Sequence, residues 1–107
     1  MEWIELNSKE QFDNLFESQS VFAVFKHSTR CSVSSTAKNR IEKEWRHQFP
    51  AYYLDLLRHR DVSNYIAERT GIEHQSPQLI VVEDKKVIYD ASHSFIFVNE
   101  IEPTSIP

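Results

Sequence analysis

The residues that could do chemistry gather around Cys31, the single cysteine of the chain, in the stretch FKHSTRCSVSS. A deprotonated thiol is a strong nucleophile, and positive charge beside it lowers its pKa. Lys26, His27 and Arg30 precede Cys31, and Ser34 follows it. These cations and this hydroxyl predict a reactive thiol, with Lys26, His27, Arg30 and Ser34 stabilising the thiolate. The alternative is an inert cysteine in a polar turn.

Ser34 determines how a disulfide on Cys31 could be resolved. In dithiol oxidoreductases a second cysteine lies three positions after the first, and here that position holds serine. A CxxS arrangement keeps the attacking thiol but cannot close an internal disulfide, so an external thiol has to release whatever Cys31 takes up. A lowered pKa helps Cys31 more as a leaving group than as a nucleophile, because nucleophilicity falls with the pKa. The pattern therefore predicts turnover through a mixed disulfide.

Composition narrows the class of protein. The chain has 107 residues, 40% of them hydrophobic and 26% charged, which is typical of a single domain spanning residues 1–107. A net charge of −4 argues against a nucleic-acid partner. The acidic start MEWIELNSKE is unlike a secretory signal, and no apolar run is long enough to span a membrane. One cysteine cannot form an internal disulfide, which fits a reducing compartment, so we expect a cytoplasmic protein. We also expect it to be a monomer.

Three elements are predicted before Cys31. Residues 3–6 form a short strand-like start. VFAVFK at 21–26 is a nearly continuous run of β-branched and aromatic residues, which is typical of a strand covered on both faces. Between them, Ser8 is placed to cap a helix of about three turns. The apolar face of that helix consists of Phe12, Leu15 and Phe16.

A longer helix is predicted after Cys31. Apolar residues recur there at every fourth position and form one helical face of about five turns. They are Val33, Ala37, Ile41, Trp45 and Phe49. Pro50 ends the helix, and residues 51–57 follow as a second central strand. Cys31 is therefore expected at the N-terminus of this helix, directly after the strand at 21–26.

The second half of the chain predicts a helix and a hairpin. Asp61 is a plausible N-cap for a helix that ends at Gly71, the only glycine of the chain. Residues 78–92 contain two short apolar runs around a charged turn and predict a β-hairpin. Residues 94–101 favour a last helix over a strand, and residues 102–107 are expected to fray.

The predicted order is β α β α β α β β α. A strand, a helix and a strand in succession favour a parallel pair with a right-handed crossover, and the hairpin adds antiparallel strands. We therefore predict an α/β fold with a mixed central sheet and helices on both faces. This arrangement is typical of the thioredoxin-like fold.

Two motifs carry a resemblance to a known family. FKHSTRCSVSS, followed about forty residues later by GIEHQSPQLIVV, resembles the YtxJ-like monothiol bacilliredoxins, a branch of the thioredoxin superfamily. The resemblance covers nearly the whole chain. The usual family site reads TCPIS and this chain has RCSVS, so Cys31 and Ser34 match while Arg30 and Ser32 depart.

The resemblance implies a second set of site residues. By position, Pro77 is the proline that in thioredoxin-like proteins is cis and faces the active cysteine. Ser76 would then offer its backbone to an extended substrate chain. His74 and Gln78 match family positions beside the cleft, although a polar loop before a strand would also explain both. His27 either tunes the thiol or only caps a strand end in solvent.

The resemblance also implies the reaction. Family members remove bacillithiol from protein cysteines by taking it onto their own cysteine. We expect the same activity through Cys31, with thiolated proteins as partners, bacillithiol or a similar low-molecular-weight thiol as co-substrate, and no cofactor. A metal site is not expected, because Cys31 and His27 supply two of the usual four ligands.

Two other functions stay open at this stage. The first is a thioredoxin-fold binding module that holds a protein partner or shares an iron–sulfur cluster, as CGFS-type monothiol glutaredoxins do. The Gly and Phe of that motif are Ser32 and Val33 here, which weighs against a cluster. The second is a structural role with an inert Cys31.

Overall fold

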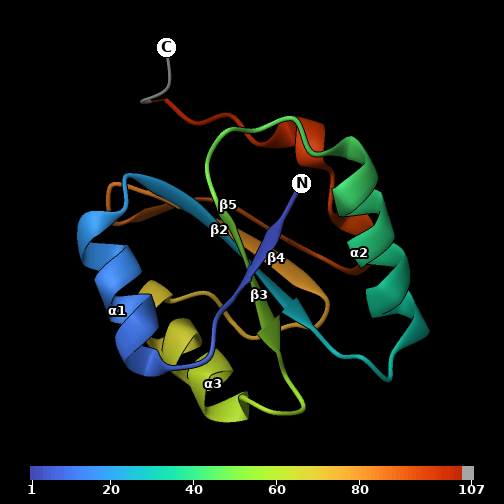
Figure 1. Ribbon diagram of the computed structural model, residues 1–107, viewed down its shortest axis with the longest axis horizontal. Coiled ribbons are helices and arrows are strands. Elements are labelled where there is room, and N and C mark those ends of the chain that lie inside the picture. The colour runs from blue at the N-terminus through green and yellow to red at the C-terminus, as the bar shows by residue number, and fades with distance from the viewer. Residues whose placement is uncertain (105–107) are drawn as a thin grey trace.

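The computed structural model describes residues 1–104 and contains eight regular elements (Figure 1). Two short 3-10 turns, η1 (His93–Phe95) and η2 (Val98–Glu100), follow the last of them. The elements are β1 (Trp3–Glu5), α1 (Lys9–Ser18), β2 (Val21–His27), α2 (Ser32–Glu44), β3 (Ala51–Asp55), α3 (Arg60–Thr70), β4 (Gln78–Glu83) and β5 (Lys86–Ser92).

The five strands form one mixed sheet in the order β1-β3-β2-β4-β5. Strands β1, β3 and β2 run parallel, whereas β4 is antiparallel to both β2 and β5. Helix α2 covers one face of the sheet, and α1 and α3 cover the other (Figure 1). The predicted α/β class, with a mixed sheet and helices on both faces, is confirmed.

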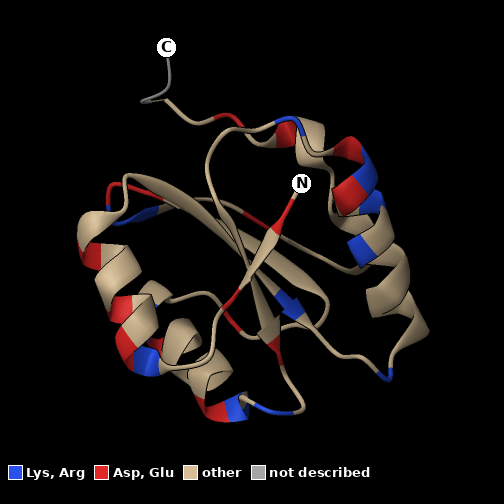
Figure 2. Cartoon of the chain, in the orientation of Figure 1, with Lys and Arg blue, Asp and Glu red and all other residues tan. Residues whose placement is uncertain are grey.

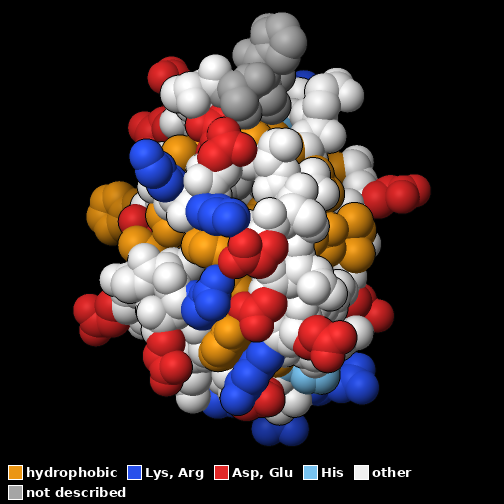
Figure 3. Space-filling model, turned by 90° about the vertical axis from the view of Figure 1, so that its left-hand side faces the viewer, with side chains coloured by type: hydrophobic (Ala, Val, Ile, Leu, Met, Phe, Trp, Pro, Cys, Tyr) orange, Lys and Arg blue, Asp and Glu red, His pale blue; other side chains and the backbone are white. Residues whose placement is uncertain are grey.

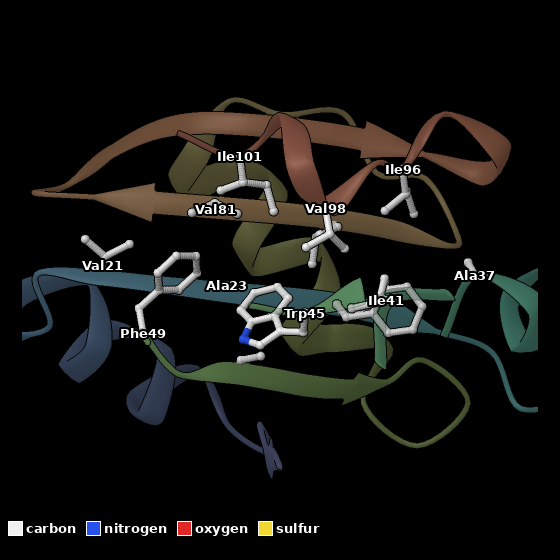
Figure 4. Packing of buried hydrophobic residues seen from close by; sticks show 13 residues of the cluster. Val21, Ala23, Ala37, Ile41, Trp45, Phe49, Val81, Ile96, Val98 and Ile101 are labelled. Carbon is white, nitrogen blue, oxygen red and sulfur yellow. The ribbon is translucent and has the colours of Figure 1, made fainter. Parts of the chain in front are cut away.

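Strand β2 is the centre of the sheet, and all seven of its residues are buried. Because side chains alternate along a strand, β2 contributes to two separate cores. Val21, Ala23 and Phe25 face α2 and pack with Ile41 and with other buried residues of that side (Figure 4). Phe22 and Val24 face α1 and α3 on the opposite side. The double burial explains why residues 21–25 of this strand are all apolar.

Helix α1 begins as predicted. Ser8 is the N-cap, and its hydroxyl accepts a hydrogen bond from the backbone N–H of Gln11 at 3.0 Å. The Gln11 side chain accepts in return from the N–H of Asn7 at 2.8 Å, so two amides at the helix start are satisfied. Phe12 and Leu15 are buried under this helix.

Helix α2 is shorter than predicted. It ends at Glu44, and Trp45 is already extended, with ψ of 122°. The guanidinium of Arg46 donates to the carbonyls of Lys43 and Trp45 at 3.2 and 2.9 Å, which satisfies acceptors at the helix end. Trp45 nevertheless packs in the core (Figure 4). The apolar residues at every fourth position therefore extend beyond the end of the helix.

Val33 is the second departure in α2. It was expected on the apolar face, but half of its surface is exposed. The core face of the helix begins one turn later, at Ala37. An exposed valine beside Cys31 therefore belongs to the surface around the thiol.

The predicted last helix at 94–101 is wrong. The segment forms the turns η1 and η2 instead, because other elements satisfy its backbone. The guanidinium of Arg40 donates to the carbonyls of Ser94 and Ile96, at 3.4 and 3.0 Å. The hydroxyl of Tyr89 accepts from the N–H of Phe97 at 2.9 Å. Tertiary hydrogen bonds thus replace the helical ones.

The remaining boundaries differ slightly. The strand predicted at 51–57 ends at Asp55. Asp61 lies in the first turn of α3 rather than at its cap, which is His59. Gly71 ends α3 as predicted, with a positive φ of 75° that a residue without Cβ adopts freely. Strands β4 and β5 form the predicted hairpin across a turn with two positive-φ residues, Asp84 and Lys85.

The tail expected to fray at 102–107 is only partly covered by the structure. Thr104 donates to the Glu83 carboxylate through its N–H at 3.1 Å and its hydroxyl at 2.6 Å. Residues 105–107 lie outside the described residues.

Charged side chains of both signs share the surface that carries α1 (Figure 3). Glu17 there forms ion pairs with Arg69 at 3.8 Å and with Lys85 at 2.9 Å. Within residues 1–104, every helix is too short or too polar to cross a bilayer.

Candidate functional site

Cys31 lies where the sequence predicts it, between β2 and α2. It is the N-cap residue of α2, with an extended backbone at φ −108° and ψ 120°. Its N–H donates to the carbonyl of Ser28 at 3.1 Å, which closes a turn over residues 28–31. The side chain is partly exposed and makes no capping hydrogen bond within the described part of the chain. The sulfur is thus accessible at the positive end of the helix dipole.

Ser34 is buried directly behind this turn. Its hydroxyl oxygen lies 2.6 Å from Nδ1 of His27 and accepts from the N–H of Ser28 at 3.1 Å. None of its surface is exposed. Ser34 therefore ties the end of β2 and the start of the turn to the first turn of α2.

The ring of His27 lies against two aromatic side chains. It stacks on Phe25 at 5.6 Å between ring centroids and contacts Tyr53 at 5.4 Å. Burial lowers the pKa of His27, and the nearby Lys38 lowers it further, against an opposing effect of Asp55. Burial favours the neutral ring, whose tautomer decides which of Nδ1 and the Ser34 hydroxyl donates in their hydrogen bond. The alternative of a solvent-exposed strand cap is wrong, because His27 is 4% exposed.

Lys26 points to the other face of the sheet. Its amine donates to the carbonyl of Ser63 in α3 at 3.2 Å and lies 3.4 Å from Nδ1 of His74. The side chain is fully buried, and burial lowers the pKa of Lys26 to about 8. Adjacent residues of a strand point to opposite faces, so Lys26 meets α3 whereas His27 meets α2.

The predicted substrate residues lie on the segment that leads into β4. The bond between Ser76 and Pro77 is cis, as the resemblance implied. The carbonyl of Pro77 accepts from the N–H of His93 at 3.0 Å, which brings the start of η1 beside it. The hydroxyl of Ser76 is buried and has no hydrogen-bond partner among residues 1–104.

His74 and Gln78 contact their own chain. Nδ1 of His74 lies 2.9 Å from the Ser63 hydroxyl, in addition to its contact with Lys26. Burial and the charges of Lys26 and Arg60 lower the pKa of His74. The Gln78 amide donates to the carbonyl of Glu73 at 3.0 Å and accepts from the N–H of Gln75 at 3.2 Å.

The structure therefore separates the predicted site residues into two groups, and Ser76 and Pro77 lie between His74 and Gln78 on the segment that leads into β4. His27 and Ser34 adjoin the turn that carries Cys31, and exposed Arg30 lies in that turn. Lys26, His74 and Gln78 form the second group, on the α3 face of the sheet. Lys26 contacts His74, and it pairs with Gln78 across β2 and β4.

Sequence reasoning missed two participants. Ser28 and Ser63 supply the contacts that order each group. Ser63 is buried next to the core residue Val62 of α3, and its burial is seen only in the structure.

Solved structures that resemble this fold include thioredoxins and a protein described as an oxidoreductase. A protein provisionally described as an oxidoreductase with a thioredoxin fold is 32% identical, with a TM-score of 0.81 over 90% of this chain and 87% of that one. Thioredoxin from Malassezia sympodialis is 16% identical, with a TM-score of 0.68 over 92% of this chain and 84% of its own. Thioredoxin from Trypanosoma brucei brucei is 18% identical, with a TM-score of 0.67 over 87% and 80%.

The fold and the lone thiol at a helix start define a thioredoxin-fold protein of the single-cysteine type, the class of the thiol oxidoreductases. The model of the monothiol bacilliredoxin BrxC family matches residues 4–101. The chain belongs to this family, which confirms the resemblance recognised in its two motifs.

Proposed function

We propose that this protein removes bacillithiol, or a similar low-molecular-weight thiol, from mixed disulfides on protein cysteines in the cytoplasm. The observation that carries the proposal is the position of Cys31 as the partly exposed N-cap of α2, with serine at the position of a resolving cysteine. Membership of the monothiol bacilliredoxin family supports it.

The first step is a thiol–disulfide exchange. The Cys31 thiolate attacks the small-thiol sulfur of the mixed disulfide, and a new disulfide forms between Cys31 and the small thiol. The protein sulfur leaves with the electron pair of the broken bond and takes up a proton from solvent. The helix N-terminus and exposed Arg30 place positive charge beside the anionic sulfur that attacks.

The second step restores Cys31. Ser34 cannot form a disulfide, and its hydroxyl is engaged by His27 and Ser28. A second molecule of the small thiol, as its thiolate, therefore attacks the small-thiol sulfur bound to Cys31. A symmetric small-thiol disulfide forms, and Cys31 leaves as the thiolate. Both steps exchange sulfur for sulfur, so the proposed reaction uses the small thiol as co-substrate and requires no resident cofactor.

The protein substrate is proposed to lie along the residues that precede β4. An extended chain can pair with exposed backbone groups of its host, and Ser76 is the residue proposed to offer such groups. Exposed Val33 and Phe95, on α2 and η1, supply apolar surface on elements that flank Cys31 and adjoin Pro77. The substrate is thus a peptide segment that carries a thiolated cysteine.

The test is turnover with a synthetic peptide whose cysteine carries bacillithiol, in the presence of excess free bacillithiol. Wild-type protein should release the free peptide thiol catalytically, and Cys31→Ser should reduce the rate to that of the uncatalysed reaction. Ser35→Ala, an exposed change four residues along the same helix, serves as the matched control and should retain activity. A Cys31→Ser variant as active as wild type would refute the proposal.

A further inference from the structure

The face of the sheet under α1 and α3 has a polar end. Along β2 and β4 this face is formed by apolar residues of the core, such as Phe22, Val24 and Ile80. The same alternation continues to Lys26 on β2 and Gln78 on β4, which pair directly in the antiparallel register. The only cation of β2 thus occupies a fully buried position in a strand that is otherwise uncharged (Figure 2).

Lys26 and Gln78 direct their polar atoms to the same segment, residues 71–77. Lys26 contacts His74 of that segment and fixes it to α3 through the carbonyl of Ser63. Gln78 binds the segment twice through its side-chain amide, at the carbonyl of Glu73 and the N–H of Gln75. Residues 73–75 are therefore each contacted by Lys26 or Gln78, which pair with each other across β2 and β4.

The cost of this arrangement points to a purpose other than stability. A buried amine without a carboxylate partner opposes folding, because its charged form loses hydration. Among the described residues, the polar contacts of Lys26 are one carbonyl and one imidazole, and no carboxylate forms an ion pair with it. An apolar side chain of similar size would fill this position at lower cost. What Lys26 adds is a polar link between α3 and the segment, through the carbonyl of Ser63 and the ring of His74.

We propose that Lys26 and Gln78 are positioning residues that fix segment 71–77, and with it the backbone of Ser76, in the geometry that binds a peptide substrate. Neither residue touches the reacting sulfur atoms; they act through His74, Glu73 and Gln75. The inference deepens the proposed function and rests on its peptide site beside Cys31. Lys26 and Gln78 are thus expected to affect how tightly the peptide binds, and not how fast the Cys31 thiol reacts.

The experiment separates peptide binding from thiol reactivity. The probe is a cysteine peptide in mixed disulfide with 2-nitro-5-thiobenzoate. The Cys31 thiolate attacks the peptide sulfur, a disulfide forms between Cys31 and the peptide, and coloured thionitrobenzoate leaves with the electron pair. The symmetric reagent 5,5′-dithiobis(2-nitrobenzoate) reports the same thiol without a peptide. Lys26→Met and Gln78→Leu keep side-chain size while removing the hydrogen bonds.

We expect saturation with the peptide for wild type, and an apparent dissociation constant about 5- to 30-fold larger for each variant, as the loss of one or two buried hydrogen bonds implies. The rate at saturation and the rate with the symmetric reagent should each stay within about twofold of wild type. Lys86→Met, at an exposed lysine of β5, is the matched control and should behave as wild type. Circular dichroism verifies folding, and His74→Gln in the half-buried segment tests the same contact if a core variant fails to fold.

Three results would overturn the inference: an unchanged peptide constant in folded Lys26→Met and Gln78→Leu, an equal loss with peptide and symmetric reagent, or absence of saturation in wild type. The probe carries no bacillithiol. A wild-type protein that saturates with this peptide but leaves a bacillithiolated one untouched would refute the proposed function while supporting the peptide site.

Discussion

The hydroxyl of Ser34 lies 2.6 Å from Nδ1 of His27 and joins the first turn of α2 to the last residue of β2. The same oxygen accepts from the N–H of Ser28, so one buried hydroxyl fixes both ends of the turn that presents Cys31. Serine at this position therefore has two effects. It excludes an internal disulfide, and it holds the turn in place.

Removal of the hydroxyl should destabilise the protein. Ser34→Ala leaves the Nδ1 of His27 and the N–H of Ser28 without this partner inside the fold. We expect a loss of about 1–3 kcal/mol in the free energy of unfolding, measured by urea denaturation. Ser35→Ala, an exposed neighbour, should change it by less than about 0.5 kcal/mol. Equal stabilities of the two variants would show that the Ser34 contacts contribute nothing.

Ser34→Cys should convert the site into a dithiol. Residues three apart at a helix start have neighbouring side chains, a spacing that a disulfide can bridge. Mild oxidation is then expected to remove two hydrogen atoms from the monomer, as seen by intact mass, and to protect Cys31 from alkylation. Ser35→Cys places the second thiol on the exposed side of the helix and should stay reduced in the monomer. A Ser34→Cys monomer that keeps both thiols after oxidation would contradict this geometry.

Ser32→Pro should be tolerated, although it restores only one of the three positions at which RCSVS differs from the usual family site TCPIS. Ser32 is the first residue of α2, where the N–H has no partner within the helix and the φ of proline is favourable. Cys31 already has the extended backbone that a following proline requires. We expect about 0.4–1 kcal/mol of added stability in urea denaturation, from lower entropy of the unfolded chain. A destabilised variant would show that the Ser32 amide is needed.

The fold was predictable where residues close in sequence determine the local structure. The apolar run at the start of β2, the Ser8 cap and the positive φ at Gly71 each follow from local chemistry. The strand at 21–26 and the apolar spacing after residue 31 placed Cys31 at the start of a helix. The segment 94–101 was not predictable, because hydrogen bonds from Arg40 and Tyr89 replace its helical ones. Arg40 lies 56 residues before Ile96 in the sequence, and Tyr89 belongs to β5. A single sequence does not show that these residues meet.

The candidate site was predictable only in part for a similar reason. Lys26 and His27 are neighbours in sequence, so both were expected beside Cys31. The strand continues through His27, however, and its alternation sends Lys26 to α3 and His27 to α2. Proximity in sequence thus indicated the right end of the sheet but not the right face.

Stability should fall in mild acid because of His27. Burial lowers its pKa below the ordinary value of about 6.5. Between these two values the unfolded chain binds a proton that the folded chain does not, so stability falls as the pH drops below about 6.5. The pKa of His74 is lowered as well and acts in the same direction.

Urea denaturation from pH 7.5 down to about pH 5 measures this effect, with a slope of at most about 1.4 kcal/mol per pH unit for each histidine. His27→Gln should flatten the pH dependence. Ser35→Ala, at an exposed helix position without a titratable side chain, is the control and should keep the wild-type slope. A slope of the same size in His27→Gln and wild type would contradict the assignment of a neutral His27.

The most direct test of the account is the identity of the group that Cys31 carries after one turnover. Reduced protein is mixed with an equimolar peptide whose cysteine carries bacillithiol, the reaction is quenched in acid, and the intact mass of the protein is measured. The account predicts one bacillithiol on Cys31 and an equal amount of free peptide thiol. Unmodified protein, or the peptide itself attached to Cys31 with bacillithiol released, would contradict it.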